Sequence, residues 1–342
     1  MSRSRWAATF STLLMAVLVL TAWLVPVPFV SIGRGPTYDV LGQVDGKDVV
    51  TVKNLPTYPT SGHLNMTTVS VTDGLSAVDA LARWLSPDYM VLPRSIPFPP
   101  GETLEQINQR NQQDFADSQA SAEGAAFAYL GLPTVAVVEG FAEGESAARG
   151  ILETGDTILA VAGVPVSTPQ QIMDALAPTR PGQEITVTVR RGDDPQPKDL
   201  TVRLGGRADT QQGVLGIYPG ARPVDREEVS ISLGDVGGPS AGLMFTLAII
   251  DKLTPGEMTN GRFIAGTGTI TSTGQVGRIE GIRYKMLAAR EAGATAFLVP
   301  ADNCEAARAN APEGLQLAKV STLHEAVAAV EELGRGGDPP TC

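Results

Sequence analysis

The sequence predicts an α+β protein with an N-terminal transmembrane helix and about two folded domains after it. No charged residue occurs between Trp6 and Ile32. The 342 residues leave room for about two domains beyond this apolar segment. With 43% hydrophobic and 18% charged residues, the composition is typical of a folded chain. We expect these ranges: 1–32 cytoplasmic tip and anchor, 33–118 membrane-proximal strands and helices, 119–206 and 207–335 two domains, and 336–342 a tail.

The apolar segment is longer than the roughly 20 residues that a membrane-spanning helix needs. Arg3 and Arg5 precede it, so the positive-inside rule predicts a cytoplasmic N-terminus with the bulk of the chain outside the plasma membrane. A cleaved signal peptide is the alternative. The segment is long for one and has no small-x-small cleavage site before Gly33, so we expect a single-pass, uncleaved anchor.

Composition also excludes some partners. The net charge of −11 argues against nucleic acid as a partner. Two cysteines and two separated histidines, His63 and His324, form no recognisable zinc cluster, and we expect no metal and no cofactor. Cys304 and Cys342 leave two alternatives open: a disulfide that tethers the tail, or a buried thiol and a free terminal one.

Residues 33–118 combine strands and helices. Strand-like runs cover 48–53 and 63–71, and helical patterns cover 75–85 and 103–129. Four prolines between Pro93 and Gly101 separate the two helices. We expect the first strands to pair with the sheet of the C-terminal domain, which would make that domain discontinuous.

Residues 130–205 follow a different order. The strand-like run 135–138 precedes Gly144-Glu-Ser-Ala-Ala-Arg-Gly-Ile-Leu-Glu-Thr-Gly-Asp-Thr-Ile-Leu-Ala-Val-Ala-Gly163, and a short helix and two strands follow it. This order and the Ala-Ala…Gly-Ile…Gly-Asp signature resemble a bacterial PDZ domain. The resemblance implies an extended peptide bound as an added strand, with its carboxylate held by a loop that corresponds to Leu130, Gly131 and Leu132. A PDZ fold that only packs against its neighbours is the alternative.

The C-terminal domain contains a serine in an unusual setting. Gly237-Gly238-Pro239-Ser240-Ala241-Gly242 lies between a strand-like run at 228–233 and a helix-like run at 243–250. Proline suits a first helical turn. The N–H groups and the dipole of such a turn stabilise an oxyanion. We expect the backbone at Gly238 and Ala241 to supply these donors. A serine that merely caps the helix is the alternative.

A lysine lies on the apolar face of a later helix. In the run 280–292, Lys285 shares its face with Gly281, Ile282 and three alanines. Burial lowers the pKa of a lysine, and a neutral amine can take a proton from serine. A lysine that extends to the surface is the alternative.

Together these motifs resemble the proteolytic domain of Lon-type serine proteases over 206–332. They are Gly-Pro-Ser-Ala-Gly at 238–242, Gly266-Thr-Gly-Thr-Ile270 and Gly281-Ile-Arg-Tyr-Lys-Met-Leu-Ala-Ala289. The resemblance implies that Ser240 is the nucleophile, Lys285 the general base and Thr267 a support for the amine. It implies protein or peptide substrates and makes a homo-oligomer plausible. Gly237 and Thr269 stand where the family commonly has acidic residues. No Gly-x-x-x-x-Gly-Lys-Ser/Thr run occurs, so we expect an ATP-independent endopeptidase.

Two other functions fit parts of the pattern. Gly238-Pro-Ser-Ala-Gly242 also matches the elbow of an α/β-hydrolase esterase, with Asp302 and His324 in the required order. His324 lies in a helix-like run rather than in a loop, which disfavours this function. A non-catalytic, membrane-tethered PDZ scaffold is the other alternative.

Overall fold

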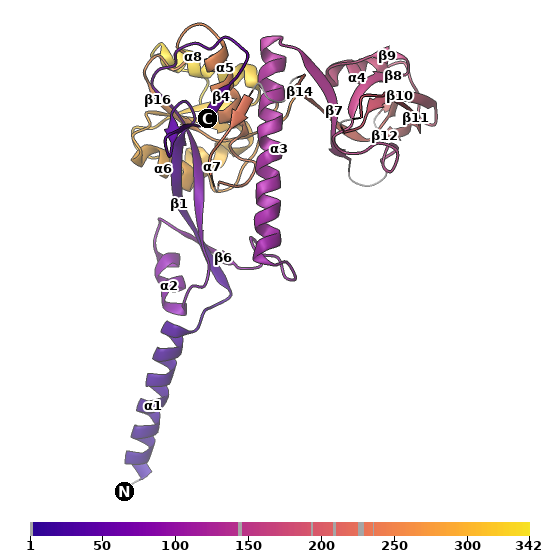
Figure 1. Ribbon diagram of the computed structural model, residues 1–342. Coiled ribbons are helices and arrows are strands. Elements are labelled where there is room, and N and C mark those ends of the chain that lie inside the picture. Colours follow the sequence, from indigo (N-terminus) through magenta and orange to yellow (C-terminus); the bar gives the residue numbers. More distant parts are fainter. Residues whose placement is uncertain (1–2, 143–145, 193, 208–209, 225–228, 235) are drawn as a thin grey trace.

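The computed structural model describes residues 3–142, 146–192, 194–207, 210–224, 229–234 and 236–342. These residues form two folded parts, and the long helix α3 (Leu104–Leu130) stands between them (Figure 1). Helix α1 (Arg3–Leu24) extends away from both parts.

The first part is built on a mixed sheet of six strands. Their order is β20 (Gln316–Val320), β19 (Ala296–Pro300), β16 (Phe263–Gly266), β5 (His63–Thr72), β1 (Phe29–Asp39) and β6 (Met90–Pro93). The strands from β20 to β5 are parallel, whereas β1 runs antiparallel to both β5 and β6. Strands from the beginning and the end of the chain therefore share one sheet, and the second part lies between them in sequence.

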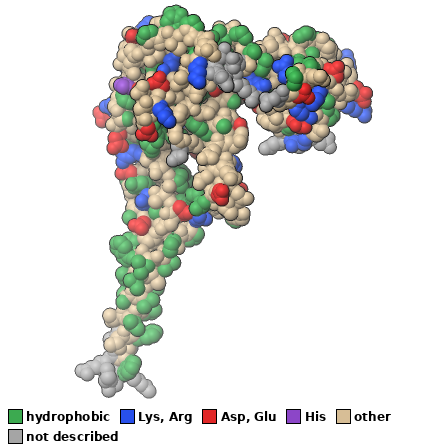
Figure 2. All heavy atoms as spheres, in the orientation of Figure 1, with side chains coloured by type: hydrophobic (Ala, Val, Ile, Leu, Met, Phe, Trp, Pro, Cys, Tyr) green, Lys and Arg blue, Asp and Glu red, His purple; other side chains and the backbone are tan. Residues whose placement is uncertain are grey.

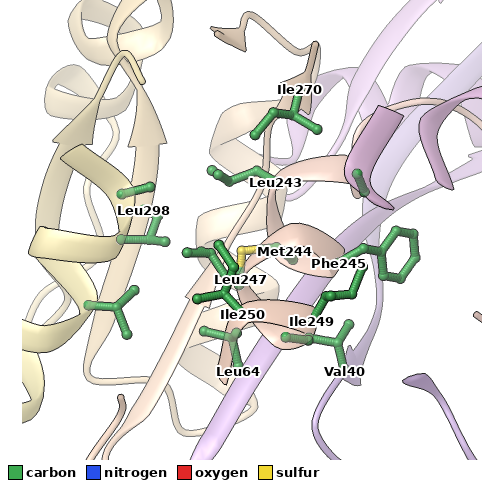
Figure 3. Packing of buried hydrophobic residues seen from close by; sticks show 14 of the residues in the cluster. Val40, Leu64, Leu243, Met244, Phe245, Leu247, Ile249, Ile250, Ile270 and Leu298 are labelled. Atoms are coloured by element: carbon green, nitrogen blue, oxygen red, sulfur yellow. The ribbon is translucent and has the colours of Figure 1, made fainter. Parts of the chain in front are cut away.

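Helices cover both faces of this sheet. Side chains alternate along a strand, so Leu298 packs on one face of β19 while Phe297 and Val299 pack on the other. Helices α5 (Gly242–Leu253) and α8 (Leu323–Gly334) cover the first face, and α6 (Ile282–Glu291) and α7 (Cys304–Ala309) cover the second. In Figure 3, α5 directs apolar side chains toward Leu64 and Leu298. Nearly all of α5 is buried, which fixes the position of the loop before it.

The second part is a sheet with one short helix. Its order is β11 (Lys198–Arg203), β10 (Glu184–Arg190), β8 (Thr157–Val161), β7 (Thr134–Phe141) and β14 (Ile217–Pro223), with β9 (Val164–Pro165) beside β8. Helix α4 (Pro169–Leu176) packs on a separate apolar core that includes Ile158 and Val187. A mixed α+β protein with a β-rich, PDZ-like part was predicted, and this is confirmed.

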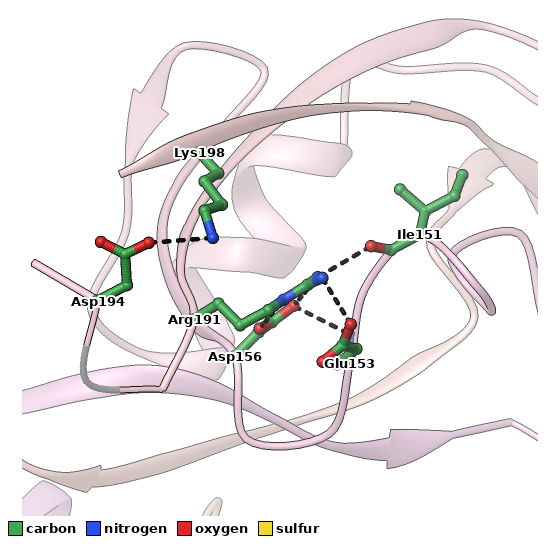
Figure 4. Close-up of polar contacts among 6 residues, drawn as sticks. All are labelled: Ile151, Glu153, Asp156, Arg191, Asp194 and Lys198. Atoms are coloured by element: carbon green, nitrogen blue, oxygen red, sulfur yellow. Dashed lines mark hydrogen bonds and ion pairs between the residues drawn. The ribbon is translucent and has the colours of Figure 1, made fainter. Parts of the chain in front are cut away.

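An arginine cross-links the loops of this second part (Figure 4). Arg191 donates hydrogen bonds to Asp156 at 2.9 and 2.8 Å, to Glu153 at 2.6 Å and to the Ile151 carbonyl at 3.0 Å. Asp156 is 1% exposed, and Arg191 is its ion-pair partner.

Short ribbons and one further helix complete the elements. They are β2 (Gln43–Val44) with β3 (Lys47–Asp48), β4 (Val50–Val52) with β15 (Val229–Ile231), β12 (Gly205–Arg207) with β13 (Thr210–Val214), β17 (Thr269–Ile270) with β18 (Val276–Gly277), helix α2 (Ala77–Leu85) and the 3-10 turn η1 (Ala301–Asn303).

The N-terminal segment differs from the expected anchor. Helix α1 ends at Leu24, because Pro26 and Pro28 follow it and favour extended backbone. From Phe29 the chain enters β1, where Val30 is fully buried in the sheet. Among the described residues, no helix is both long and apolar enough to cross a membrane, so the predicted transmembrane helix over 1–32 is not supported. Figure 2 shows many apolar side chains on the surface of α1. Phe10 of this helix is 67% exposed.

The C-terminal tail is held in place. Cys304 and Cys342 form a disulfide, which decides between the two alternatives that the sequence left open. The tail also lies beside β20, where the Lys319 N–H donates to the Pro340 carbonyl at 2.8 Å. Pro339 is buried.

Candidate active site

Ser240 lies in the loop that leads into α5. Helix α5 begins at Gly242, and Ala241 is its N-cap without a side-chain cap bond. Two backbone hydrogen bonds join this loop and the start of α5 to Gly268. The Gly268 N–H donates to the Ser240 carbonyl at 2.9 Å, and the Leu243 N–H donates to the Gly268 carbonyl at 3.1 Å. The loop is therefore attached both to α5 and to the segment after β16.

Lys285 approaches this serine from α6. Its Nζ donates to Ser240 Oγ at 2.8 Å and to Thr267 Oγ1 at 3.0 Å. The residue is only 2% exposed. Burial lowers the pKa of Lys285 to about 8, because the ammonium form loses its hydration. A substantial fraction of the amine is then neutral near neutral pH, as a general base must be.

Thr267 connects the two. It is fully buried, and its hydroxyl accepts from Lys285 while donating to the Ser240 carbonyl at 3.0 Å. The sequence singled out these three residues from separate segments, and the fold brings them within hydrogen-bonding distance of one another.

Gly238 and Ala241, the two residues expected to supply oxyanion donors, make different backbone contacts. The Gly238 N–H donates to the Asn111 carbonyl of α3 at 2.9 Å, so in this conformation it is already engaged. Ala241 uses its carbonyl to accept from Met244 and Phe245 in the first turn of α5. Sequence reasoning missed the contribution of Asn111, because no local pattern shows that α3 packs against this loop.

A cavity of about 480 Å³ opens beside Ser240 and Lys285. Met66, Thr68 and Val69 of β5 form one wall, and Arg278 to Glu280 form another. The β5 residues were also missed, since they lie about 170 positions before the serine and only the sheet pairing of β5 with β16 brings them near. The cavity is large enough for a substrate side chain next to the nucleophile.

The residues of the esterase alternative lie elsewhere. His324 packs its ring on Tyr129 with centroids 4.9 Å apart, and it lines a different cavity. Asp302 lies in η1. The titratable side chain that contacts Ser240 is Lys285.

The loop expected to hold a peptide carboxylate serves another purpose. Leu130 and Leu132 pack against the core of the first part, and Gly131 is the C-cap of α3. The Gly131 N–H donates to the Ala128 carbonyl at 3.3 Å and the Leu132 N–H to the Phe127 carbonyl at 2.9 Å. Both donors close the end of a helix, so they are not free to bind a carboxylate.

The described part of the chain contains no group of three or more His, Cys, Asp or Glu side chains that could hold a metal ion.

Comparison with known proteins identifies two domains. Residues 232–331 match the Lon protease (S16) C-terminal proteolytic domain, and residues 114–204 match the PDZ domain. The chain thus contains a proteolytic domain of the serine peptidase type together with a PDZ domain, as predicted.

The similar proteins cover the chain only in part. The Lon protease of Clostridioides difficile is 42% identical over 79 residues, which are 23% of this chain and 10% of that protein. The Lon protease of Metamycoplasma arthritidis is 29% identical over 158 residues, 33% of this chain and 19% of that protein. The crystal structure of the PDZ domain of the SdrC-like protein from Listeria monocytogenes is 18% identical, with a TM-score of 0.22, and covers 25% of this chain and 86% of that one. The chain spans less than a fifth of the length of these two Lon proteases.

Proposed function

We propose that this protein is an ATP-independent serine endopeptidase in which Ser240 is the nucleophile and Lys285 the general base. The observation that carries the proposal is the contact of 2.8 Å between Lys285 Nζ, only 2% exposed, and Ser240 Oγ. A desolvated amine beside a serine hydroxyl is the arrangement that activates a serine in the absence of histidine.

In the acylation step, neutral Lys285 takes the proton from Ser240 Oγ as that oxygen attacks a peptide carbonyl. The resulting tetrahedral oxyanion is stabilised by backbone N–H groups at the start of α5. The intermediate collapses, the C–N bond breaks, and the Lys285 ammonium gives its proton to the leaving amine. Thr267 keeps the amine aimed at the serine during these transfers.

Deacylation repeats these proton transfers with water as the nucleophile. Lys285 takes a proton from a water molecule that attacks the acyl-enzyme carbonyl, and it returns that proton to Ser240 Oγ as the ester bond breaks. Both steps use the same base, so removal of Lys285 abolishes the whole cycle.

The PDZ domain is proposed to recognise a protein or peptide by strand addition. Such binding needs an exposed sheet edge, and β14 is one of the two outer strands of the five-strand order. Leu215-Gly216-Ile217 leads into β14 and is a better candidate for carboxylate capture than the helix cap at 130–132.

We also propose that the folded parts work outside the reducing cytoplasm. The Cys304–Cys342 disulfide supports this location, because such bonds persist in oxidising compartments.

The test of the activity is proteolysis of an unfolded, casein-like protein by the full chain without ATP. Ser240→Ala and Lys285→Ala are expected to lose cleavage, and His324→Ala is expected to keep it. Loss in the histidine variant with Lys285 dispensable would replace this proposal by the hydrolase alternative. Absence of cleavage in every folded variant, together with peptide binding by Ser240→Ala, would leave a PDZ scaffold.

A further inference from the structure

Helix α3 contacts the loop that carries the nucleophile from one side. The Ser118 hydroxyl donates to the Pro239 carbonyl at 3.1 Å, and the Asn111 carbonyl accepts from the Gly238 N–H at 2.9 Å. Gln119 donates to the Ile231 carbonyl at 3.2 Å, in the strand before the loop. Ser118 is 6% exposed, so its hydrogen bond is shielded from water.

The bond from Ser118 fixes more than one carbonyl. A peptide group is planar and trans, so its C=O and N–H point in opposite directions. The Pro239 carbonyl and the Ser240 N–H belong to the same peptide group. Because Ser118 holds that carbonyl toward α3, the Ser240 N–H is turned away from α3. The orientation of a donor at the nucleophile therefore depends on a residue that does not touch the substrate.

About one to two turns beyond Ser118, α3 contacts strand β14 of the second part. The helix has 27 residues, about 40 Å in length, and it leads directly into β7 after the cap at Gly131. Gly124 faces β14 so closely that a Cβ there would lie 1.8 Å from the Ala221 carbonyl oxygen. The helix and the strand are thus in backbone contact, about 9 Å along the helix from Ser118. In Figure 1, α3 is the element between the two parts.

We propose that Ser118 is a positioning residue for the reaction at Ser240, and that α3 transmits the position of the PDZ domain to the nucleophile through it. A rigid helix moves as a unit, so the contacts at Gly124 and Ser118 shift together. A displacement of β14 shifts α3, and α3 then rotates the Pro239–Ser240 peptide group and alters the engagement of the Gly238 N–H. This inference rests on the proposed peptidase activity.

Two pairs of variants of the full chain test the proposal. Ser118→Ala removes the hydrogen bond, and Ser121→Ala makes the same chemical change one turn further along α3. Gly124→Ala forces α3 away from β14 while improving helix propensity. Gly140→Ala is its control, because a Cβ there meets only Tyr218 Cδ2 at an ordinary 3.6 Å.

Ser118→Ala and Gly124→Ala are expected to lower kcat about tenfold to a hundredfold, as misplaced oxyanion donors do. KM should remain within about twofold of the wild-type value. The pH midpoint should remain within about 0.3 unit of wild type, because a pKa change of one unit at Lys285 needs about 1.4 kcal/mol. Both limits are about the scatter of such measurements. The two control variants should match wild type. A purely structural role for Ser118 would instead lower the amount of folded protein and leave the kcat of the folded fraction unchanged.

Amide hydrogen exchange gives a readout that does not need activity. In a Ser240→Ala background, Gly124→Ala should speed exchange of the Gly238 amide, which α3 protects, and Gly140→Ala should not. If the wild type cleaves and Gly124→Ala changes neither kcat nor the exchange of the Gly238 amide, the proposed coupling through α3 is wrong. The peptidase proposal would still stand. Changed exchange in a protein that never cleaves would overturn the peptidase proposal and with it the role of Ser118 in catalysis.

Discussion

Lys285 is buried at a free-energy cost that its proposed role requires. Its pKa of about 8 results from desolvation, and Nζ donates hydrogen bonds to two hydroxyl oxygens, those of Ser240 and Thr267. At pH 7 roughly one lysine in ten is then neutral, compared with fewer than one in a thousand for an ordinary lysine. Burial of Lys285 thus lowers the stability of the fold and provides the neutral amine that the proposed mechanism needs.

The pH dependence of cleavage follows from this pKa. kcat/KM of the wild type should rise about tenfold per pH unit below the midpoint and level off above pH 8, because only the neutral amine accepts the serine proton. The measurement is initial rates of peptide cleavage between pH 6 and 9.5. A flat profile, or a midpoint near 6.5 as for histidine, would contradict lysine as the base.

The same burial predicts a stabilising substitution. The pKa of Lys285 is lower in the folded protein than in the unfolded chain, so folding releases a proton between about pH 8 and 10.5, and below pH 8 the folded state carries the full cost of a buried ammonium. Lys285→Met should raise the free energy of unfolding at pH 7 by about 1–3 kcal/mol. The wild type regains stability as pH rises from 8 to 10.5, so the difference should shrink over that range. Urea denaturation at pH 7 and pH 10 measures it, and an unchanged difference would contradict the assignment of the cost to Lys285.

At the scale of single elements, α3 contacts both folded parts. Its start agrees with the sequence, because Thr103 and Gln106 form a reciprocal capping box. Its surroundings could not be predicted, since the helix is polar on average and small residues such as Ser118 and Gly124 mark its contacts.

Glu123 of α3 titrates in an unusual range. It lines a cavity of about 510 Å³ between α3, β7 and β14, together with Asp117, Glu139 and Arg222. Burial raises the pKa of Glu123 to about 7, and burial also raises the pKa of Glu139. Two carboxyl groups at this contact between the helix and the PDZ sheet therefore resist ionisation.

Removal of the Glu123 charge should stabilise the protein in alkaline solution. The Glu123 carboxyl stays protonated to higher pH in the folded state than in the unfolded chain. The stability that this protonated carboxyl contributes is therefore lost as pH rises from 4.5 to about 7. Glu123→Gln should raise the free energy of unfolding at pH 8 by about 1–2 kcal/mol and change little at pH 4. Denaturation at both pH values tests it, with the exposed Glu184→Gln as control. An equal effect at both pH values would point to packing rather than to the charge.

The sequence was most informative where local chemistry was unusual. A glycine-flanked serine and a lysine on an apolar face indicated Ser240 and Lys285, because each pattern lies within one segment. Pairings between distant segments have no such local signal. The two leucines around Gly131 have the pattern of a PDZ loop, yet they cap α3, since only the tertiary packing decides which core receives them. The apolar run at the N-terminus was likewise divided by its prolines into a helix and a sheet strand.

At the scale of the whole molecule, the tail is fastened to the proteolytic domain. The disulfide joins the first residue of α7 to the last residue of the chain, 38 positions apart. Gln316 adds a side-chain hydrogen bond to Asp338 at 2.8 Å. The sheet edge at β20 is therefore covered by the tail rather than left open.

Loss of this bond should destabilise the domain. The Cys304→Ala/Cys342→Ala variant should lose about 2–4 kcal/mol of unfolding free energy, since the bridge restricts the unfolded chain. Thermal unfolding with and without dithiothreitol measures the effect. The reductant should lower the Tm of the wild type to that of the variant and leave the variant unchanged. A wild type insensitive to dithiothreitol, with the variant equally stable, would show that the tail needs no covalent bond.

The mixed sheet also sets the order of events during synthesis. Strand β5 leaves the ribosome early, but its partner β16 follows only after the entire PDZ domain. Domains fold as units while the chain emerges, so the PDZ domain can fold before the six-stranded sheet, whose strands precede and follow it in sequence, is complete. Ser240 is made 45 residues before Lys285, and β19 and β20 come later still. Under the proposed mechanism, a nascent chain therefore carries the serine without its base, and it gains peptidase activity only when translation is nearly finished.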